Sequence, residues 1–395
     1  MKTTFKKSLS MLLALMMIVA LMLSATSCGG GGSDGVDAEA GRGDFIESLG
    51  GVSETFTGAV SVEEYESAED AAVAFVAEEV VGESEAEIVK AESKGELSEA
   101  QVTALNIPEE FSEGIVSVEE YEVEYAVATI DDDSVAGNTQ KVKVYIIKYE
   151  NSWKYFAPAP ITGETISKSY YDSVFNNEKY QNSTFEYKMD MEMDMSASAQ
   201  GQSMKITVSM SMYQLVKYED GKIYFKQTMT TSSNMAELIP TSSESIEAYV
   251  ESVEGEYGED IVCYINQGNG WVEGDLYSIG FGSLKELTPF YDQYIDYSYF
   301  TKTDFGFKLS DENAKKFVDE FYSDLLMGMA EAFELDMYAE YYVCDGTLSG
   351  MRMDMEMDID YSEMGATVSG DATITATTTC TNYGTTVVEK PAGVN

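Results

Sequence analysis

The feature that most constrains the fold of this chain is the alternation of methionine with charged residues. Two runs carry it: Met189, Met191, Met193 and Met195, and Met351, Met353, Met355 and Met357, with one charged residue between successive methionines. A period of two places all the methionines on one face of a β-strand and all the charges on the other. Antiparallel sheets with one apolar and one solvated face are built from such strands. We call these two runs the methionine ladders.

The segments beside the ladders extend this pattern. Met204–Met212, Ile223–Met229 and Ala366–Ala376 also alternate, and Asp220-Gly221 is typical of a tight turn between two strands. Two further segments, 236–255 and 310–333, are predicted to be helical, the second capped by Ser310. We therefore expect residues 186–390 to form a large curved antiparallel sheet, a half-barrel, packed on two or three helices.

The preceding part of the chain predicts a smaller domain at residues 62–160. Ala68–Val81 has the spacing of an amphipathic helix, and Tyr121–Val127, Val142–Tyr149 and Trp153–Phe156 read as an antiparallel meander. A polar segment, 161–185, is expected to link this domain to the larger one. The predicted fold class is therefore α+β.

The N-terminus has the three regions of a secretory signal at residues 1–27. Lys2, Lys6 and Lys7 precede the apolar run Met11–Leu23. This run is too short to span a bilayer, which requires a helix of about 20 apolar residues. Small residues then lead to Cys28. The stretch LSATSC resembles a bacterial lipobox, although Ala25 stands where leucine is usual. The resemblance implies that Cys28 carries a lipid and anchors the protein to a bilayer; the alternative is a plain secretory signal and an ordinary thiol.

Residues 28–61, rich in Gly, Ser and Asp, are expected to form a flexible tether after this anchor. The predicted location is therefore the extracytoplasmic face of the cell membrane.

Composition excludes several classes of function. The chain has no histidine, which removes the Ser-His-Asp and Cys-His catalytic systems and the histidine-based metal sites. Its net charge of −46 repels nucleic acid. The three aspartates Asp131–Asp133 do not have the spacing of a calcium loop and are expected to form a solvated turn. We predict no catalytic residue, no metal, no cofactor and no enzymatic activity; the sequence makes no prediction about oligomeric state.

Three cysteines besides Cys28 leave two interpretations open. Cys344 and Cys380 both fall late in the predicted sheet and would form a disulfide in an oxidising compartment. Alternatively, Cys263, Cys344 and Cys380 are three isolated thiols. No CxxC motif is present, so neither a redox pair nor a thiolate metal site is predicted.

Two family resemblances accompany these patterns. The order of strands and helices from Tyr187 to the C-terminus resembles the LolA/LppX-like lipoproteins, in which a half-barrel encloses acyl chains or acylated lipids. The hairpin KVKVYIIKYENSWKYFAPAP resembles the end of nuclear-transport-factor-2-like domains. The first resemblance implies a carrier of apolar ligands but identifies no individual binding residue.

Two functions follow from these observations. A strand face made only of methionine is flexible and polarizable, which suits the binding of lipid or another apolar small molecule. The ladder methionines are then the ligand-binding residues, whereas the simpler interpretation is that they pack on the helices as a core. In that second case the protein is a surface-displayed module that binds a protein or a glycan and has no ligand cavity.

Overall fold

The structure is a computed structural model, and the described part of the chain covers most of the sequence after Arg42. It comprises residues 42–49, 56, 58–81, 86–127, 139–180, 182–199, 202–219, 221–235, 240–255, 258–275, 297–310, 313–314, 316, 333–363 and 366–394. The predicted signal peptide and Cys28 lie outside these residues, as does the Asp131–Asp133 turn.

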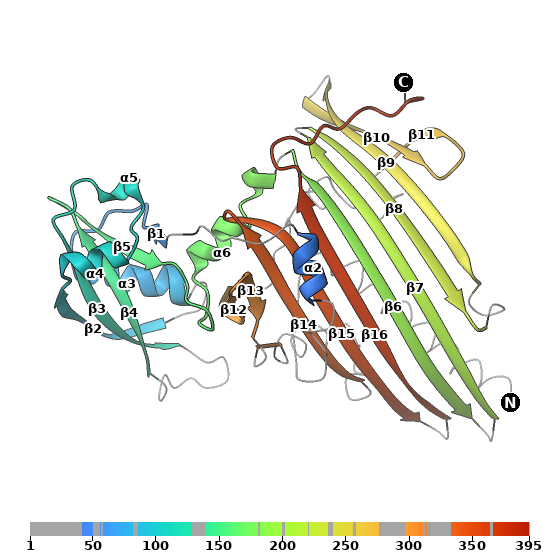
Figure 1. Ribbon diagram of the computed structural model, residues 1–395, viewed down its shortest axis with the longest axis horizontal. Coiled ribbons are helices and arrows are strands. Elements are labelled where there is room, and N and C mark those ends of the chain that lie inside the picture. Colours follow the sequence, from blue (N-terminus) through green and yellow to red (C-terminus); the bar gives the residue numbers. More distant parts are fainter. Residues whose placement is uncertain are drawn as a thin grey trace. The chain divides into compact units, whose positions relative to one another are not determined.

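The chain divides into two compact units. The smaller consists of Glu54–Phe175 and Phe300–Asp304, and the larger of Met1–Ser53, Asn176–Tyr299 and Phe305–Asn395. Most described residues lie in antiparallel strands, which form curved, open sheets (Figure 1). The expectation of a mostly antiparallel α+β fold is therefore confirmed.

The smaller unit is built on a five-stranded antiparallel sheet of order β1-β5-β4-β3-β2. Its strands are β1 (Gly58–Val60), β2 (Ala86–Glu96), β3 (Ser117–Val127), β4 (Thr139–Lys148) and β5 (Trp153–Pro158). Gly58 has a φ of 108°, and a Cβ there would lie 2.5 Å from the Phe156 ring, so the close pairing of β1 with β5 requires glycine. The strand β12 (Phe300–Thr303) also belongs to this unit.

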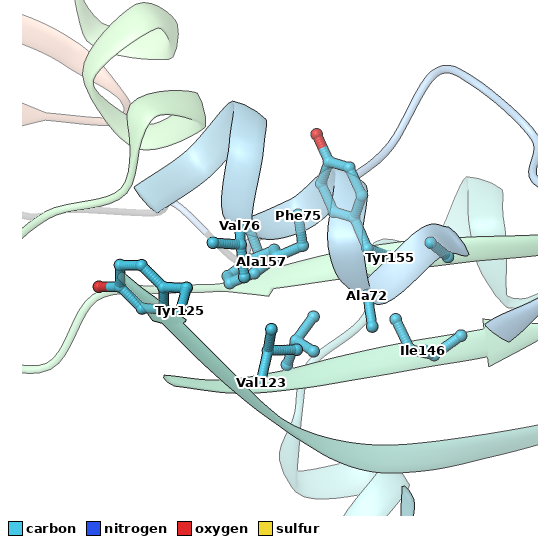
Figure 2. Packing of buried hydrophobic residues seen from close by; sticks show 10 residues of the cluster. Ala72, Phe75, Val76, Val123, Tyr125, Ile146, Tyr155 and Ala157 are labelled. Carbon is cyan, nitrogen blue, oxygen red and sulfur yellow. The ribbon is translucent and has the colours of Figure 1, made fainter. Parts of the chain in front are cut away.

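Helices cover both faces of this small sheet. On one face lie α3 (Ala68–Phe75) and the π-helix Val76–Val81 that continues it, packed through Ala72, Phe75 and Val76 on Val123, Ile146 and Tyr155 (Figure 2). The other face is covered by α4 (Glu99–Ala104) and α5 (Glu109–Ser112). A third helix, α6 (Lys168–Val174), is capped by Ser167, whose hydroxyl accepts from Tyr170 N.

The larger unit is dominated by long antiparallel strands that follow the order β11-β10-β9-β8-β7-β6-β16-β15-β14-β13 (Figure 1). Their bounds are β6 Thr184–Ala199, β7 Gln202–Glu219, β8 Lys222–Ser233, β9 Ser242–Gly255, β10 Gly258–Asn266, β11 Trp271–Gly274, β13 Gly306–Leu309, β14 Phe333–Cys344, β15 Thr347–Glu363 and β16 Ala366–Thr381. Both methionine ladders lie in strands as predicted, on β6 and β15. Because β16 pairs with both β15 and β6, the last strand of the chain lies between the two ladders.

Two predictions fail here. Residues 242–255 form the strand β9 and not a helix, because Ile246, Ala248 and Val250 alternate with polar residues and pair with β8 and β10. The tether predicted at 28–61 contains the helix α2 (Arg42–Ser48) and the strand β1, so at those residues it is not a flexible linker.

The helix predicted at 310–333 lies mostly outside the described residues. Its start agrees with the prediction, since Asn313 and Ala314 are helical and Ser310 Oγ accepts from Asn313 N at 3.2 Å. At the other end, Phe333 is the first residue of β14.

Candidate ligand-binding face

All eight predicted ligand-binding methionines lie on one face of the large sheet, which we call the methionine face. Met189 and Met191 on β6 are opposite Ala376 and Ile374 on β16, and these are in turn opposite Met353 and Met355 on β15. Antiparallel partners point to the same side of a sheet. The two ladders therefore flank β16 as parallel rows, about 10 Å apart across two strand spacings.

Between the two rows, β16 contributes mostly short side chains. Gly370, Ala372 and Ala376 share the methionine face with Ile374. Gly370 is fixed by packing, because a Cβ at that position would lie 2.4 Å from the Asp194 carbonyl oxygen. The methionines of the two rows are therefore longer than most side chains of β16 between them, and thioether chains adapt their shape at little energetic cost.

The methionine face continues onto the neighbouring strands. Met212 and Met210 of β7 stand beside Met189 and Met191, and Met337 of β14 stands beside Met355. Phe307 of β13 stacks on Tyr341 of β14 with ring centroids 5.0 Å apart. The result is a continuous apolar surface across several strands.

Every ladder methionine is between 0% and 6% exposed. A ligand reaches these side chains only when they are uncovered. The expectation that the ladders pack on the helices stays a prediction, because the segment 310–333 lies mostly outside the described residues.

The opposite face, called the polar face, is only partly solvated. Asp190, Glu192, Asp358 and Asp360 are exposed, as expected for a solvated row. Arg352 and Asp354 are buried instead, which the sequence pattern did not predict. They form a bidentate ion pair at 2.7 and 3.1 Å, and Thr375 Oγ1 donates to Asp354 at 2.9 Å.

A second buried carboxylate, Glu340, lies directly across from Arg352 on the polar face. Arg42 of α2 donates to both oxygens of Glu340, at 2.7 and 2.8 Å, and the hydroxyls of Tyr338 and Tyr342 each donate to Oε2 at 2.8 Å. Nothing in the sequence signals this pair, because Arg42 and Glu340 are 298 residues apart.

Apolar contacts hold α2 in the same place. Phe45 packs edge-on against Tyr342, and Gly350 has no Cβ where Leu49 and Phe45 approach. The short helix that follows residues 28–41 is thereby fixed to the sheet (Figure 1).

The surroundings of Glu340 favour its ionised form. Burial alone raises the pKa of this carboxyl, but the hydrogen bonds from Arg42, Tyr338 and Tyr342 outweigh burial and lower the pKa below its usual value. Glu340 therefore remains an anion paired with the Arg42 cation.

The smaller unit holds a buried carboxylate of a different kind, Glu79, on the π-helix. Glu79 Oε2 accepts from Ser169 N at 2.8 Å, and Glu79 Oε1 lies 3.2 Å from the Tyr155 hydroxyl. The same hydroxyl lies 2.7 Å from Oε2 of Glu78, whose other oxygen accepts from Tyr65. Figure 2 shows the Tyr155 ring standing beside the helix.

Counting protons defines the state of this cluster. One tyrosine hydroxyl carries one proton and cannot donate to two carboxylates at once. If Tyr155 donates to Glu78, the contact with Glu79 is a hydrogen bond only when Glu79 is protonated. Burial raises the pKa of Glu79, with the bonds from Ser169 and Tyr155 and the charge of Lys168 opposing it in part.

The cysteines follow the second of the two interpretations left open by the sequence. Cys263, Cys344 and Cys380 are free thiols. The disulfide between Cys344 and Cys380 does not form, because β15 lies between β14 and β16. Two strand spacings are about 10 Å, whereas a disulfide needs Cα atoms within about 7 Å. Burial raises the pKa of Cys380 to about 12, which leaves a thiol with little thiolate character.

The described residues contain no group of three or more Asp, Glu or Cys side chains arranged to hold a metal ion. Within the same residues, no helix has both the length and the apolar character needed to cross a membrane.

Comparison with known proteins adds little to this geometry. No family model and no curated protein matches the sequence. Among solved structures, the chain is similar to the crystal structure of a DUF1329 family protein from Desulfovibrio piger, at 10% identity, covering 56% of this chain and 94% of that chain with a TM-score of 0.17. A TM-score this low carries no argument about fold or function.

Proposed function

We propose that the protein is an exported lipoprotein, anchored through Cys28, that binds lipid or another apolar ligand on the methionine face. One observation carries the proposal: two rows of flexible methionine side chains flank a strand of mostly short side chains on one apolar face. An adaptable apolar surface of this kind accommodates hydrocarbon of varied shape. The proposed form of the unit is the half-barrel of the LolA/LppX-like carriers, with the ligand along β16 between the rows.

The first test places larger side chains on β16, between the two ladders. Ala372→Leu combined with Ala376→Leu adds bulk between the ladders, while Thr373→Leu places a leucine on the exposed polar face of the same strand. Titration with the uncharged dye diphenylhexatriene, whose fluorescence rises in apolar surroundings, measures binding. We expect the double variant to bind about tenfold more weakly, the cost of overpacking a tight site. Thr373→Leu should bind as the unaltered protein does.

Circular dichroism of both variants controls for unfolding. Equal dye binding by the folded double variant and the unaltered protein would contradict a site over β16. A second variant, with Met351, Met353, Met355 and Met357 all replaced by serine, should abolish dye binding because it removes the apolar side chains of one ladder; circular dichroism checks its folding as well.

Anchoring is tested separately. Cys28→Ala should release the protein from membranes into the medium, as measured by fractionation of the host cells. Unchanged membrane retention of that variant would count against lipid attachment at Cys28.

A second candidate function is supported by the burial of the ladders. A surface-displayed module that binds a protein or a glycan needs the methionines only as a core, and every one of them is at most 6% exposed. Mass spectrometry of organic extracts from protein purified from its native host separates the two functions. A bound lipid supports the carrier, whereas repeated absence of lipid together with absent dye binding supports the module.

A further inference from the structure

A row of polar side chains lies on the methionine face, from β16 to β8. Thr378 of β16 is opposite Tyr187 of β6, which is opposite Gln214 of β7, which is opposite Gln227 of β8. We call these four residues the polar row. It spans three strand spacings, about 14 Å.

The rows on either side of it are apolar. One side carries Met353, Ala376, Met189 and Met212, and the other carries Cys380, Phe185 and Val216. On β6 and β16 the hydroxyl groups of this face therefore stand at a single level, towards one end of the methionine ladders, whereas β8 and β9 carry further polar side chains, Thr231, Ser233 and Glu244, at other levels.

Thr378 is the residue of the polar row that indicates a bound ligand. Its Oγ1 atom is buried, and it has no hydrogen-bond partner in the part of the chain that the structure describes. A buried hydroxyl without a partner costs free energy, because it has lost its hydrogen bonds to water without replacement, so such groups are rare unless something satisfies them. The cost is removed if a bound molecule supplies a donor or an acceptor at this position.

The polar row is uncharged, which restricts the chemistry of that molecule. Threonine, tyrosine and glutamine offer both donors and acceptors, but none supplies a cation. The chain as a whole carries a net charge of −46. An anionic group brought to this row would lose its hydration without gaining a counter-charge. A neutral group with hydroxyl or ester oxygens meets no such penalty.

The distance along β16 fits one hydrocarbon chain. From Thr378 to Gly370 the strand advances eight residues, about 27 Å. One leaflet of a bilayer core, half of roughly 30 Å, corresponds to about 15 Å of acyl chain. An acyl chain that starts at the polar row therefore ends before Gly370, within the stretch flanked by both ladders.

We propose that the ligand is a long-chain amphiphile with a neutral head group, of the monoacylglycerol class. The head group hydrogen-bonds to Thr378 in the polar row, and the acyl chain lies between the ladders. This inference rests on the proposed binding of apolar ligands at the methionine face and specifies which class of lipid that face accepts.

The test compares three probes that share a sixteen-carbon chain: monopalmitoylglycerol, palmitate and hexadecane, each displacing diphenylhexatriene from the full chain. Monopalmitoylglycerol should bind most tightly. Thr378→Val keeps the shape of the side chain and removes its hydroxyl, so it should weaken monopalmitoylglycerol about threefold to tenfold, the value of one hydrogen bond. Hexadecane should be unaffected, and Thr378→Ser should restore the affinity for monopalmitoylglycerol.

Thr377→Val is the matched control, because Thr377 lies on the opposite face of the same strand, paired with Arg352 and Lys188. It should change the binding of none of the three probes. Thermal unfolding checks that the Thr378→Val protein is folded, and removal of an unsatisfied hydroxyl should leave it at least as stable as the unaltered protein.

The outcomes separate this inference from the proposed function. Equal affinity of hexadecane and monopalmitoylglycerol, tighter binding of palmitate, or an unchanged affinity in Thr378→Val would each overturn the inference while leaving apolar binding intact. Failure of the unaltered protein to bind diphenylhexatriene and all three probes would overturn the proposed function, and the inference with it.

Discussion

Glu340 in the larger unit and Glu79 in the smaller unit are both buried glutamates that contact tyrosine hydroxyls, yet their pKa values shift in opposite directions. The Arg42 guanidinium donates hydrogen bonds to both carboxylate oxygens of Glu340. Glu79 instead shares a tyrosine hydroxyl with a second carboxylate, Glu78, and no arginine or lysine of the described residues lies within ion-pair distance of it. A buried carboxylate thus takes its charge state from its nearest ionic partner and not from burial alone.

Removal of the cation from Glu340 should have the largest effect. Arg42→Met leaves a buried carboxylate without its partner, which costs about 3–5 kcal/mol. Urea unfolding at neutral pH measures the loss. Lys94→Met, which breaks exposed ion pairs with Glu92 and Glu122 on the small sheet, is the control and should change stability far less. A loss in Arg42→Met no greater than in this control would mean that α2 does not stabilise the sheet.

Removal of the charge from Glu79 should increase the stability of the fold, whereas removal of Arg42 decreases it. Glu79→Gln replaces a buried carboxyl by an amide that donates to Tyr155 and accepts from Ser169. At pH 8 we expect the variant to be more stable than the unaltered protein, by about 1 kcal/mol. Destabilisation at that pH would show that the ionised form of Glu79 is the one that the fold requires.

The pH dependence of stability sharpens the contrast. The pKa of Glu340 is lowered in the folded state, so its contribution is present above its ordinary value of 4.5 and is lost as the pH falls through the folded pKa. The pKa of Glu79 is raised, so its contribution is present below 4.5 and is lost as the pH rises through the folded pKa. Urea midpoints measured from pH 3 to pH 9 should be lower for Glu340→Gln than for the unaltered protein above pH 4.5, and the two should converge as the pH falls. The midpoints of Glu79→Gln should match the unaltered protein at the acid end and exceed it at the alkaline end.

The tyrosines should contribute least. Tyr338→Phe removes one of two hydroxyls that donate to Glu340 and should cost about 1 kcal/mol, because Arg42 and Tyr342 remain. Tyr155→Phe removes the hydroxyl that Glu78 and Glu79 share and should also cost about 1 kcal/mol. Thermal unfolding at pH 5 and pH 8 detects both; a Tyr338→Phe loss as large as that of Arg42→Met would contradict the dominant role assigned to the cation.

Local pattern predicted much of the large sheet. The period of two along Met189–Met195 and Met351–Met357 identified both strands and the face that each buries, because alternation is a property of the strand alone. The helix predicted at residues 236–255 was wrong over 242–255, although Ile246, Ala248 and Val250 alternate there as in a strand. Pairing with β8 and β10 decided that segment, and such pairing is a tertiary interaction.

The sequence by itself therefore determined that β6 and β15 each place their methionines on one face. It also excluded the catalytic systems that require histidine, because the chain has none. The tertiary structure alone decided that β16 lies between β6 and β15, which keeps Cys344 and Cys380 apart and aligns Thr378 with Tyr187 and Gln214. It also brought Arg42 to Glu340. The physical reason is that cross-strand register and charge pairing depend on chain segments up to hundreds of residues apart, whereas the alternation of faces depends on adjacent residues.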